Sequence, residues 1–281
     1  MRALPFGPTG TTLPAIGLGT WNLERDDRVA AIRALRRGVE LGARHVDTAE
    51  LYGNGEVERI VAEALADRRD EIVLVSKVLP HNASRTGTIA ACERSLGRLR
   101  TDRLDGYLLH WEGPHPLADT IEAFEQLRRD GKIRWWGVSN FDEERIAEVV
   151  SLAGPGRCAC NQVLYHLQQR QVEHRVIPAC RAAGIAVVGY SPFGSGSFAG
   201  PTTPDGRALV RIADRHRTTA RRVALAYLTR DDDLFAIPKA SDAAHVEDNV
   251  AAGDLRLDPE DLAAIDDAFP RGPWRPGVPT L

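Results

Sequence analysis

Short apolar runs alternate with amphipathic stretches along nearly the whole of this 281-residue chain. The runs resemble strands that are buried on both faces, and the stretches between them have the spacing of helices that bury one face. The predicted strands cover residues 15–19, 44–47, 72–77, 104–110, 133–139, 158–162, 186–190 and 234–237. The predicted helices cover residues 26–41, 56–68, 84–99, 117–129, 142–152 and 172–183, followed by a longer helical region at 204–230. Eight strands alternating with helices favour an α/β fold of the closed (β/α)8 TIM-barrel type over an open sheet.

The barrel would carry its functional residues on one face. Right-handed crossovers place the carboxyl ends of all parallel strands together, and barrel enzymes build their sites there. The length suits one barrel, so we expect residues 1–281 to form a single domain. Residues 190–204 are rich in Gly, Ser and Pro and predict a mobile loop over a ligand. The tail at 270–281 holds four prolines and is either folded over the barrel mouth or frayed.

Composition excludes several functional classes. Hydrophobic residues make up 43% and charged residues 27% of the chain, and the net charge is −3. This balance gives no general attraction to nucleic acids or acidic membranes. The sequence shows neither a membrane-spanning run nor a signal peptide, so we expect a cytoplasmic protein. Four cysteines are too few for a disulfide framework, and Cys158 and Cys160 indicate small core residues rather than a metal site.

Four polar residues stand near the ends of three successive predicted strands: Asp47, Tyr52, Lys77 and His110. Together they suit the reduction of a carbonyl, which needs an acid for the developing alkoxide. A free tyrosine titrates near ~10, and an adjacent ammonium such as Lys77 would lower that pKa. Asp47 would balance the buried ammonium, and His110 would donate a hydrogen bond to the carbonyl oxygen. Alone, each residue has an ordinary structural interpretation, such as a loop cap or a core histidine. Their joint occurrence favours catalysis.

These four residues resemble the catalytic tetrad of the aldo-keto reductases, and the resemblance continues along the chain. It rests on residues 13–21 (LPAIGLGTW), 131–141 (GKIRWWGVSNF), 161–162 (NQ), 188–193 (VGYSPF), 237–241 (IPKAS) and 245–249 (HVEDN). The phrases at 161–167 (NQVLYHL), 237–240 (IPKA) and 244–246 (AHV) further resemble the bacterial methylglyoxal reductase branch. The resemblance implies an NAD(P)H-dependent oxidoreductase with Tyr52 as proton donor.

No Rossmann-type glycine motif precedes a helix, so the sequence does not itself mark a dinucleotide-binding fold. The nicotinamide cofactor is instead what the resemblance implies. Ser139, Asn140 and Gln162 match residues that hold the nicotinamide carboxamide, and Tyr190 matches the ring that stacks on it. The full set of cofactor residues expected from the resemblance is Gly19, Thr20, Asp47, Ser139, Asn140, Gln162, Tyr190, Ser191, Pro192, Phe193, Gly194, Ile237, Lys239, Ala240, Ser241, His245 and Asn249.

The residues expected at the adenosine end of the cofactor depart from the common pattern of the family. Lys239 and Ser241 would meet the 2′-phosphate of NADP, and Asn249 would bind adenine. His245 stands where many members carry arginine, and Ala240 replaces a common serine. A neutral imidazole is a poorer phosphate ligand than a guanidinium. We therefore expect NADPH to be preferred, with some use of NADH.

The residues expected to line the substrate pocket indicate small carbonyl substrates. Trp21 and Trp111, with Tyr52 and His110, are the expected substrate residues, and Trp274 is a further candidate for the mouth. Aromatic walls suit small apolar or planar carbonyls, and no cluster of basic residues marks the mouth for a phosphorylated substrate. We therefore expect small aldehydes and dicarbonyls such as methylglyoxal. We expect a monomer with no metal and no macromolecular partner. One alternative is a redox-sensing NADP-binding regulatory protein with little turnover, like the potassium-channel β-subunits that share this fold. A hydrolase or isomerase is disfavoured because no carboxylate pair or metal cluster is evident.

Overall fold

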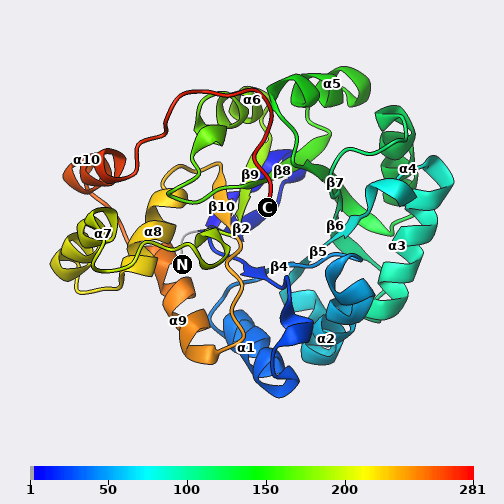
Figure 1. The fold of residues 1–281 in the computed structure, drawn as a ribbon. Coiled ribbons are helices and arrows are strands. Elements are labelled where there is room, and N and C mark those ends of the chain that lie inside the picture. Colours follow the sequence, from blue (N-terminus) through cyan, green and yellow to red (C-terminus); the bar gives the residue numbers. More distant parts are fainter. Residues whose placement is uncertain (1–2) are drawn as a thin grey trace.

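A closed sheet of eight parallel strands lies at the centre of the computed structural model, which describes residues 3–281. Its strands, in spatial and chain order, are β3 (Leu18–Gly19), β4 (His45–Asp47), β5 (Val73–Val78), β6 (Leu104–Leu109), β7 (Ile133–Ser139), β8 (Cys158–Leu164), β9 (Ala186–Tyr190) and β10 (Leu234–Ala236). Parallel bridges from Ile16 to Ala236 and from Gly19 to Lys239 join the first strand to the last. The predicted (β/α)8 barrel is therefore confirmed (Figure 1).

Helices surround this sheet (Figure 1). The α-helices are α1 (Arg28–Glu40), α2 (Glu56–Leu65), α3 (Arg85–Leu99), α4 (Leu117–Arg129), α5 (Glu143–Ala153), α6 (Val176–Ala182), α7 (Pro204–Arg215), α8 (Ala220–Leu228), α9 (Ala243–Ala251) and α10 (Pro259–Ala268). Short 3-10 helices are η1 (Gly7–Thr9), η2 (Leu23–Arg25), η3 (Tyr52–Gly55), η4 (Ala66–Glu71), η5 (Pro80–Asn82), η6 (Gln171–Glu173), η7 (Gly194–Gly196) and η8 (Ala252–Asp254). Most predicted helices begin or end within a few residues of these bounds.

The bounds predicted for one strand were wrong, and two features were not predicted in detail. The first barrel strand is shorter than the predicted 15–19, because only Leu18 and Gly19 pair continuously with β4. Residues ahead of it instead form a hairpin of β1 (Ala3–Pro5) and β2 (Thr12–Pro14), which was not predicted. The helical region at 204–230 is two helices, α7 and α8, separated by a turn.

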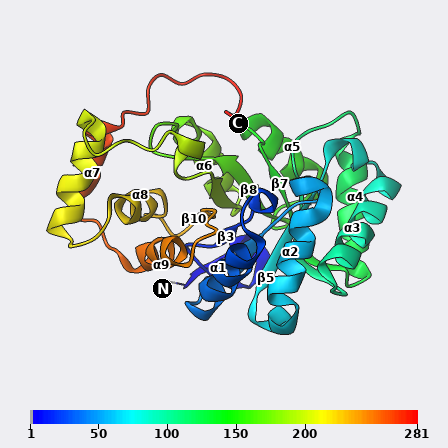
Figure 2. The same cartoon turned by 60° about the horizontal axis from the view of Figure 1, so that its bottom comes forward.

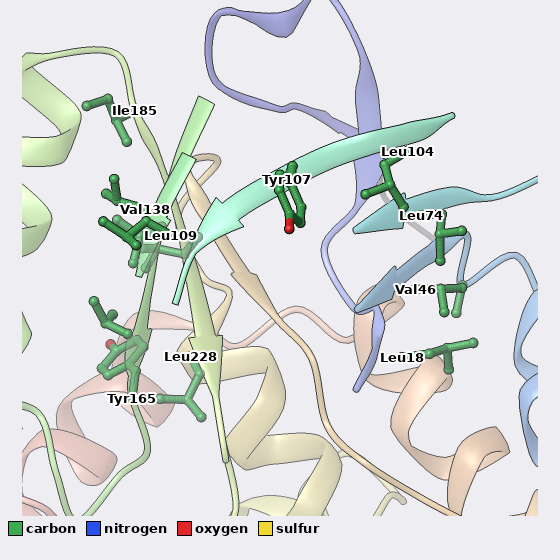
Figure 3. Packing of buried hydrophobic residues seen from close by; sticks show 14 of the residues in the cluster. Leu18, Val46, Leu74, Leu104, Tyr107, Leu109, Val138, Tyr165, Ile185 and Leu228 are labelled. Atoms are coloured by element: carbon green, nitrogen blue, oxygen red, sulfur yellow. The ribbon is translucent and has the colours of Figure 1, made fainter. Parts of the chain in front are cut away.

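Apolar side chains form two layers, one on each side of the sheet. The outer layer packs the strands against the helices, and Figure 3 shows Leu18, Val46 and Leu74 from successive strands lying in a row within it. The inner layer fills the barrel, where the ring of Phe6 from the hairpin lies 5.1 Å from Trp135 and 5.0 Å from Phe235. The hairpin thus plugs the end of the barrel where the strands begin.

The end of α10 and the segment after it are tied to the rest of the structure by polar contacts. Arg170 is almost fully buried, and it donates to the Phe269 carbonyl at 2.6 Å and to Asp266 at 2.6 Å. His174 lies 3.0 Å from the Gly272 carbonyl, and the Arg175 guanidinium lies 4.0 Å from the Trp274 ring. Figure 1 shows the segment passing α6 and reaching the centre of the barrel, and Figure 2 shows it arching over one end. Of the two interpretations of the tail, the folded one is confirmed.

Within residues 3–281, we find no helix with the length and apolarity needed to cross a membrane.

Candidate active site

The predicted tetrad is assembled where the strands end. Lys77 lies near the end of β5, Asp47 ends β4, His110 follows β6, and Tyr52 opens η3. The Lys77 ammonium donates to Asp47 Oδ1 at 2.5 Å, to the Thr48 carbonyl at 2.8 Å and to the Tyr52 hydroxyl at 3.1 Å. Lys77 is completely buried and Asp47 nearly so. The three side chains form one hydrogen-bonded chain that reaches from the barrel interior to the phenol.

Burial and charge compete at each titratable group of this chain. Burial disfavours the Lys77 ammonium, but Asp47 and Tyr52 outweigh it, so the pKa of Lys77 is raised. Burial raises the pKa of Tyr52, and the opposing effect of Lys77 does not cancel it. We expected Lys77 to lower this pKa; it acts in that direction, but the net shift is upward. Lys77 thus limits the effect of burial on Tyr52 and remains charged beside it.

His110 is held as a neutral imidazole. Burial and the nearby Lys77 charge place its pKa well below the ordinary value. Its ring lies 5.8 Å from the Tyr52 ring and 4.8 Å from the Trp111 ring, centroid to centroid. Its Nδ1 atom is buried and finds no hydrogen-bond partner among residues 3–281. A proton on Nε2 leaves only a lone pair unsatisfied at Nδ1, so this tautomer is favoured. His110 can then donate one hydrogen bond.

Amide side chains lie beside the tetrad on the next strands. Gln162, in β8, donates to Asp47 Oδ2 at 2.8 Å, a contact that the sequence did not suggest. Asn140, just after β7, donates to the His110 carbonyl at 3.1 Å and to the Ser139 hydroxyl at 3.2 Å. Tyr190 donates to Asn140 Oδ1 at 3.0 Å. The backbone of Asn140 is left-handed, with φ of 62°, a conformation that asparagine tolerates well.

These groups line a cavity of about 570 Å³. Most of the predicted site residues contribute to it: Gly19, Thr20, Trp21, Asp47, Tyr52, His110, Trp111, Ser139, Asn140, Gln162, Tyr190, Ser191, Ile237 and Lys239. Trp21 and Trp111 are the exposed aromatic residues at its opening, at 40% and 37% exposure. Trp274 is not among the lining residues and packs on Arg175 instead. The cavity thus brings Asp47, Tyr52 and His110 together with the amide rim and two tryptophans. Lys77 is fully buried and is not on the lining, but it contacts both Asp47 and Tyr52.

The other predicted cofactor residues lie outside this lining: Pro192, Phe193, Gly194, Ala240, Ser241, His245 and Asn249. They follow β9 and β10 along the chain. Phe193 packs against Phe198 and lies under the Arg221 guanidinium, 4.7 Å from its ring centre. His245 lies in the first turn of α9 and donates its backbone N–H to Asp242 at 3.2 Å. Their roles in cofactor binding stay predictions, as does the mobility of residues 190–204.

Four lining residues were not predicted. Leu51 and Glu112 each neighbour a predicted residue in sequence, so the motifs already pointed to their position. Thr280 and Leu281 come from the tail and could not be placed from sequence, because nothing in a proline-rich segment specifies where it docks. The Leu281 backbone also reaches Tyr190: burial raises the pKa of Tyr190 to about 12, and a hydrogen bond from Leu281 opposes this. The tail therefore forms part of the cavity wall.

The match to a family model is decisive for the class of protein. The model of the aldo/keto reductase family matches residues 15–269, which include every strand of the barrel. The chain belongs to the aldo/keto reductase family. As a member of this family of oxidoreductases, it has the barrel that its sequence predicted, and the catalytic roles of Asp47, Tyr52, Lys77 and His110 stay predictions. Among residues 3–281, no group of three or more His, Cys, Asp or Glu side chains is arranged to hold a metal ion.

Several members of the aldo/keto reductase family resemble this chain over almost its full length. It is 42% identical to methylglyoxal reductase YeaE of Escherichia coli K12 over 261 residues, 92% of each chain. It is 33% identical to glyoxal reductase of Bacillus subtilis 168, over 92% of this chain and 89% of that one. The crystal structure of an aldo/keto reductase from Klebsiella pneumoniae in complex with NADP and acetate superposes with a TM-score of 0.94 at 38% identity, covering all of both chains.

Proposed function

We propose that this chain reduces small aldehydes and dicarbonyls of the methylglyoxal type to alcohols, with NADPH as the preferred cofactor and Tyr52 as the proton donor. The observation that carries the proposal is the buried Asp47–Lys77–Tyr52 chain at the base of a cavity of about 570 Å³. Relatives named as methylglyoxal and glyoxal reductases and a structural neighbour crystallised with NADP support it.

The residues present suit a nicotinamide dinucleotide, which would supply the hydride. Gln162 uses its amide N–H on Asp47, so its carbonyl oxygen is the atom that can accept from a carboxamide. The Ser139 hydroxyl accepts from Asn140, which leaves its own hydrogen available to donate. The Tyr190 ring lines the same cavity and offers a flat surface for stacking. Lys239, also on the lining, is the cation for a phosphate.

The protein side of the reaction follows from the tetrad. His110, as the neutral Nε2–H tautomer, would donate a hydrogen bond to the substrate oxygen and orient the carbonyl towards Tyr52. As negative charge grows on that oxygen, the phenol would give up its proton. Lys77 would stabilise the phenolate that remains, because its ammonium lies 3.1 Å from the hydroxyl oxygen. Asp47 and Gln162 would hold Lys77 charged and in place.

Steady-state turnover with NADPH and NADH across a panel of aldehydes tests this function. We expect turnover of small aldehydes and dicarbonyls, faster with NADPH. Tight NADPH binding without turnover on any carbonyl would instead support the redox-sensing alternative.

We also propose that the protein is a cytoplasmic monomer that acts as one domain. Light scattering of the purified chain and fractionation of its host cells would test these points.

A further inference from the structure

The Lys239 side chain is already engaged by a carboxylate. β10 and the residues after it close the barrel against β3, where the Gly19 N–H donates to the Pro238 carbonyl at 3.1 Å and Gly19 bridges Lys239. This closure sets Lys239 beside the loop between η2 and α1. There the Lys239 ammonium donates to Asp26 Oδ2 and forms an ion pair with it. The two side chains are 31% and 29% exposed, so the pair is open to solvent and to a ligand.

A second carboxylate occupies the neighbouring helix terminus. Asp242 caps α9, and its Oδ1 accepts from the backbone N–H groups of Ala244 at 2.8 Å and His245 at 3.2 Å. Helix N-termini and lysines are the usual ligands of phosphate. Here both the ammonium and the helix amides face carboxylates of the chain itself. An incoming phosphate must share these donors or displace the carboxylates from them.

We propose that Asp26 is a specificity-determining residue that weakens the preference for a 2′-phosphorylated nicotinamide dinucleotide. The inference rests on the proposed function, since it assumes that Lys239 faces the 2′-phosphate. A paired ammonium presents almost no net charge at a distance, and the carboxylate itself repels a phosphate. NADPH and NADH differ only in this phosphate, so Asp26 should affect the binding of NADPH much more than that of NADH.

Asp26 could instead help NADPH to bind, and removal of its carboxylate would then change NADPH affinity in the opposite direction. If the carboxylate mainly orients Lys239 towards the phosphate, its removal should weaken NADPH binding. Partly exposed ion pairs contribute little to the ordering of side chains. The gain from orientation is therefore small compared with the charge that Asp26 neutralises. The geometry favours a residue that competes with the ligand.

The test is a comparison of cofactor dissociation constants for Asp26→Asn and the wild-type full-length chain. Quenching of the fluorescence of Trp21 and Trp111, which line the cavity, reports binding without turnover. At low and fixed ionic strength, we expect NADPH to bind about three- to tenfold more tightly to Asp26→Asn. NADH should change by less than about twofold. Asp26→Ser is a second variant that removes the same charge. It should shift the ratio of the NADPH and NADH dissociation constants in the same direction.

Asp27→Asn is the matched control. It removes one negative charge from the adjacent residue, whose Oδ1 accepts from the Ala30 N–H at 2.8 Å and caps α1. Asparagine also caps helices well, so the fold should tolerate the change. We expect the ratio of the NADPH and NADH constants to stay at the wild-type value. An equal gain in Asp27→Asn would show a general charge effect and overturn the proposal.

A double variant shows whether Asp26 acts through Lys239. The gain of Asp26→Asn should vanish in a Lys239→Gln background, and its persistence there would contradict the proposal. An unchanged or weaker NADPH affinity in Asp26→Asn, or an equal shift for both cofactors, would also overturn it. A further outcome is that the wild-type chain binds both cofactors while Asp26→Asn leaves the ratio of the NADPH and NADH dissociation constants unchanged. In that case the proposed function stands without this inference. If it binds neither cofactor, both fail together.

Discussion

The Tyr52 phenol is the group on which the proposed chemistry depends, and Tyr52→Phe tests it. The substitution removes one hydroxyl and leaves the ring that packs near His110. We expect carbonyl reduction to fall by about 10²–10⁴-fold, because that is the usual contribution of a general acid. NADPH affinity, measured by fluorescence, should stay close to that of the wild type. Retention of more than about a tenth of the turnover, a loss below ~1.4 kcal/mol in barrier, would exclude Tyr52 as the donor.

Asp47 and Lys77 should behave as a coupled pair. Their 2.5 Å contact is buried, so removal of either partner leaves an uncompensated charge beside the phenol. We expect the barrier changes of Asp47→Asn and Lys77→Met to be non-additive by about 0.5–3 kcal/mol in a double-mutant cycle. The measurement is kcat/KM for the wild type, both single variants and the double variant. Additive changes would show that the two residues act independently.

At this scale, much of the site was predictable from sequence. The tetrad could be found because its four residue types stand at strand ends, and the fold brings strand ends together. The contact between Gln162 and Asp47 could not, because it joins strands that are not neighbours in the sheet. The net upward shift in the pKa of Tyr52 also lay beyond the sequence, since it depends on how deeply the hydroxyl is buried.

The N-terminus of α9 is the element that should set cofactor preference. Lys239→Ala should weaken NADPH selectively, since it removes the cation at this terminus. His245→Arg, in the first turn of the helix, should tighten NADPH severalfold, because it adds a permanent charge and a planar set of donors. NADH should change little in either variant. Fluorescence titration with both cofactors decides the matter, and equal shifts of the two constants by His245→Arg would show that His245 does not face the 2′-phosphate.

At the scale of elements, sequence predicted regular alternation well and irregular connections poorly. The break between α7 and α8 was missed because residues 216–219 contain neither Gly nor Pro, yet Arg217 adopts a left-handed backbone with φ of 51°. The β1–β2 hairpin was missed because each strand has three residues, including a proline, and its pairing is stabilised by packing inside the barrel. Both features are set by tertiary contacts rather than by local propensity.

For the molecule as a whole, a buried histidine should couple folding to pH. His45 lies inside the barrel near Phe6, and burial lowers its pKa to about 4. A histidine in the unfolded chain titrates near ~6.5, so the unfolded state binds the proton first as pH falls. The contribution of neutral, buried His45 to the free energy of unfolding is therefore complete above pH ~6.5. It is lost progressively as the pH falls towards 4. Between pH 6.5 and 5 the loss from this residue should be about 2 kcal/mol.

Urea unfolding at these two pH values tests the coupling. His45→Leu replaces the imidazole with an apolar side chain of similar size. Between pH 6.5 and 5, the free energy of unfolding of this variant should fall by about 2 kcal/mol less than that of the wild type. His110, whose pKa is also lowered, should continue to contribute its own decline in that variant. An equal pH dependence in the wild type and in His45→Leu would contradict the assignment. Unfolding midpoints at pH 7 and above provide the reference for any general loss of packing.

The closure of the sheet between β3 and β10 also has a consequence during protein synthesis. Gly19 and Thr20 emerge from the ribosome early, but Ile237 and Lys239, which complete the same wall of the cavity, emerge more than two hundred residues later. A nascent chain that lacks β10 has an open seam at the position where the dinucleotide would lie. Cofactor affinity should therefore arise late, once the seam has closed. Ribosome-bound chains stopped before Leu234 should leave NADPH free in solution, and longer ones should take it up as the seam forms.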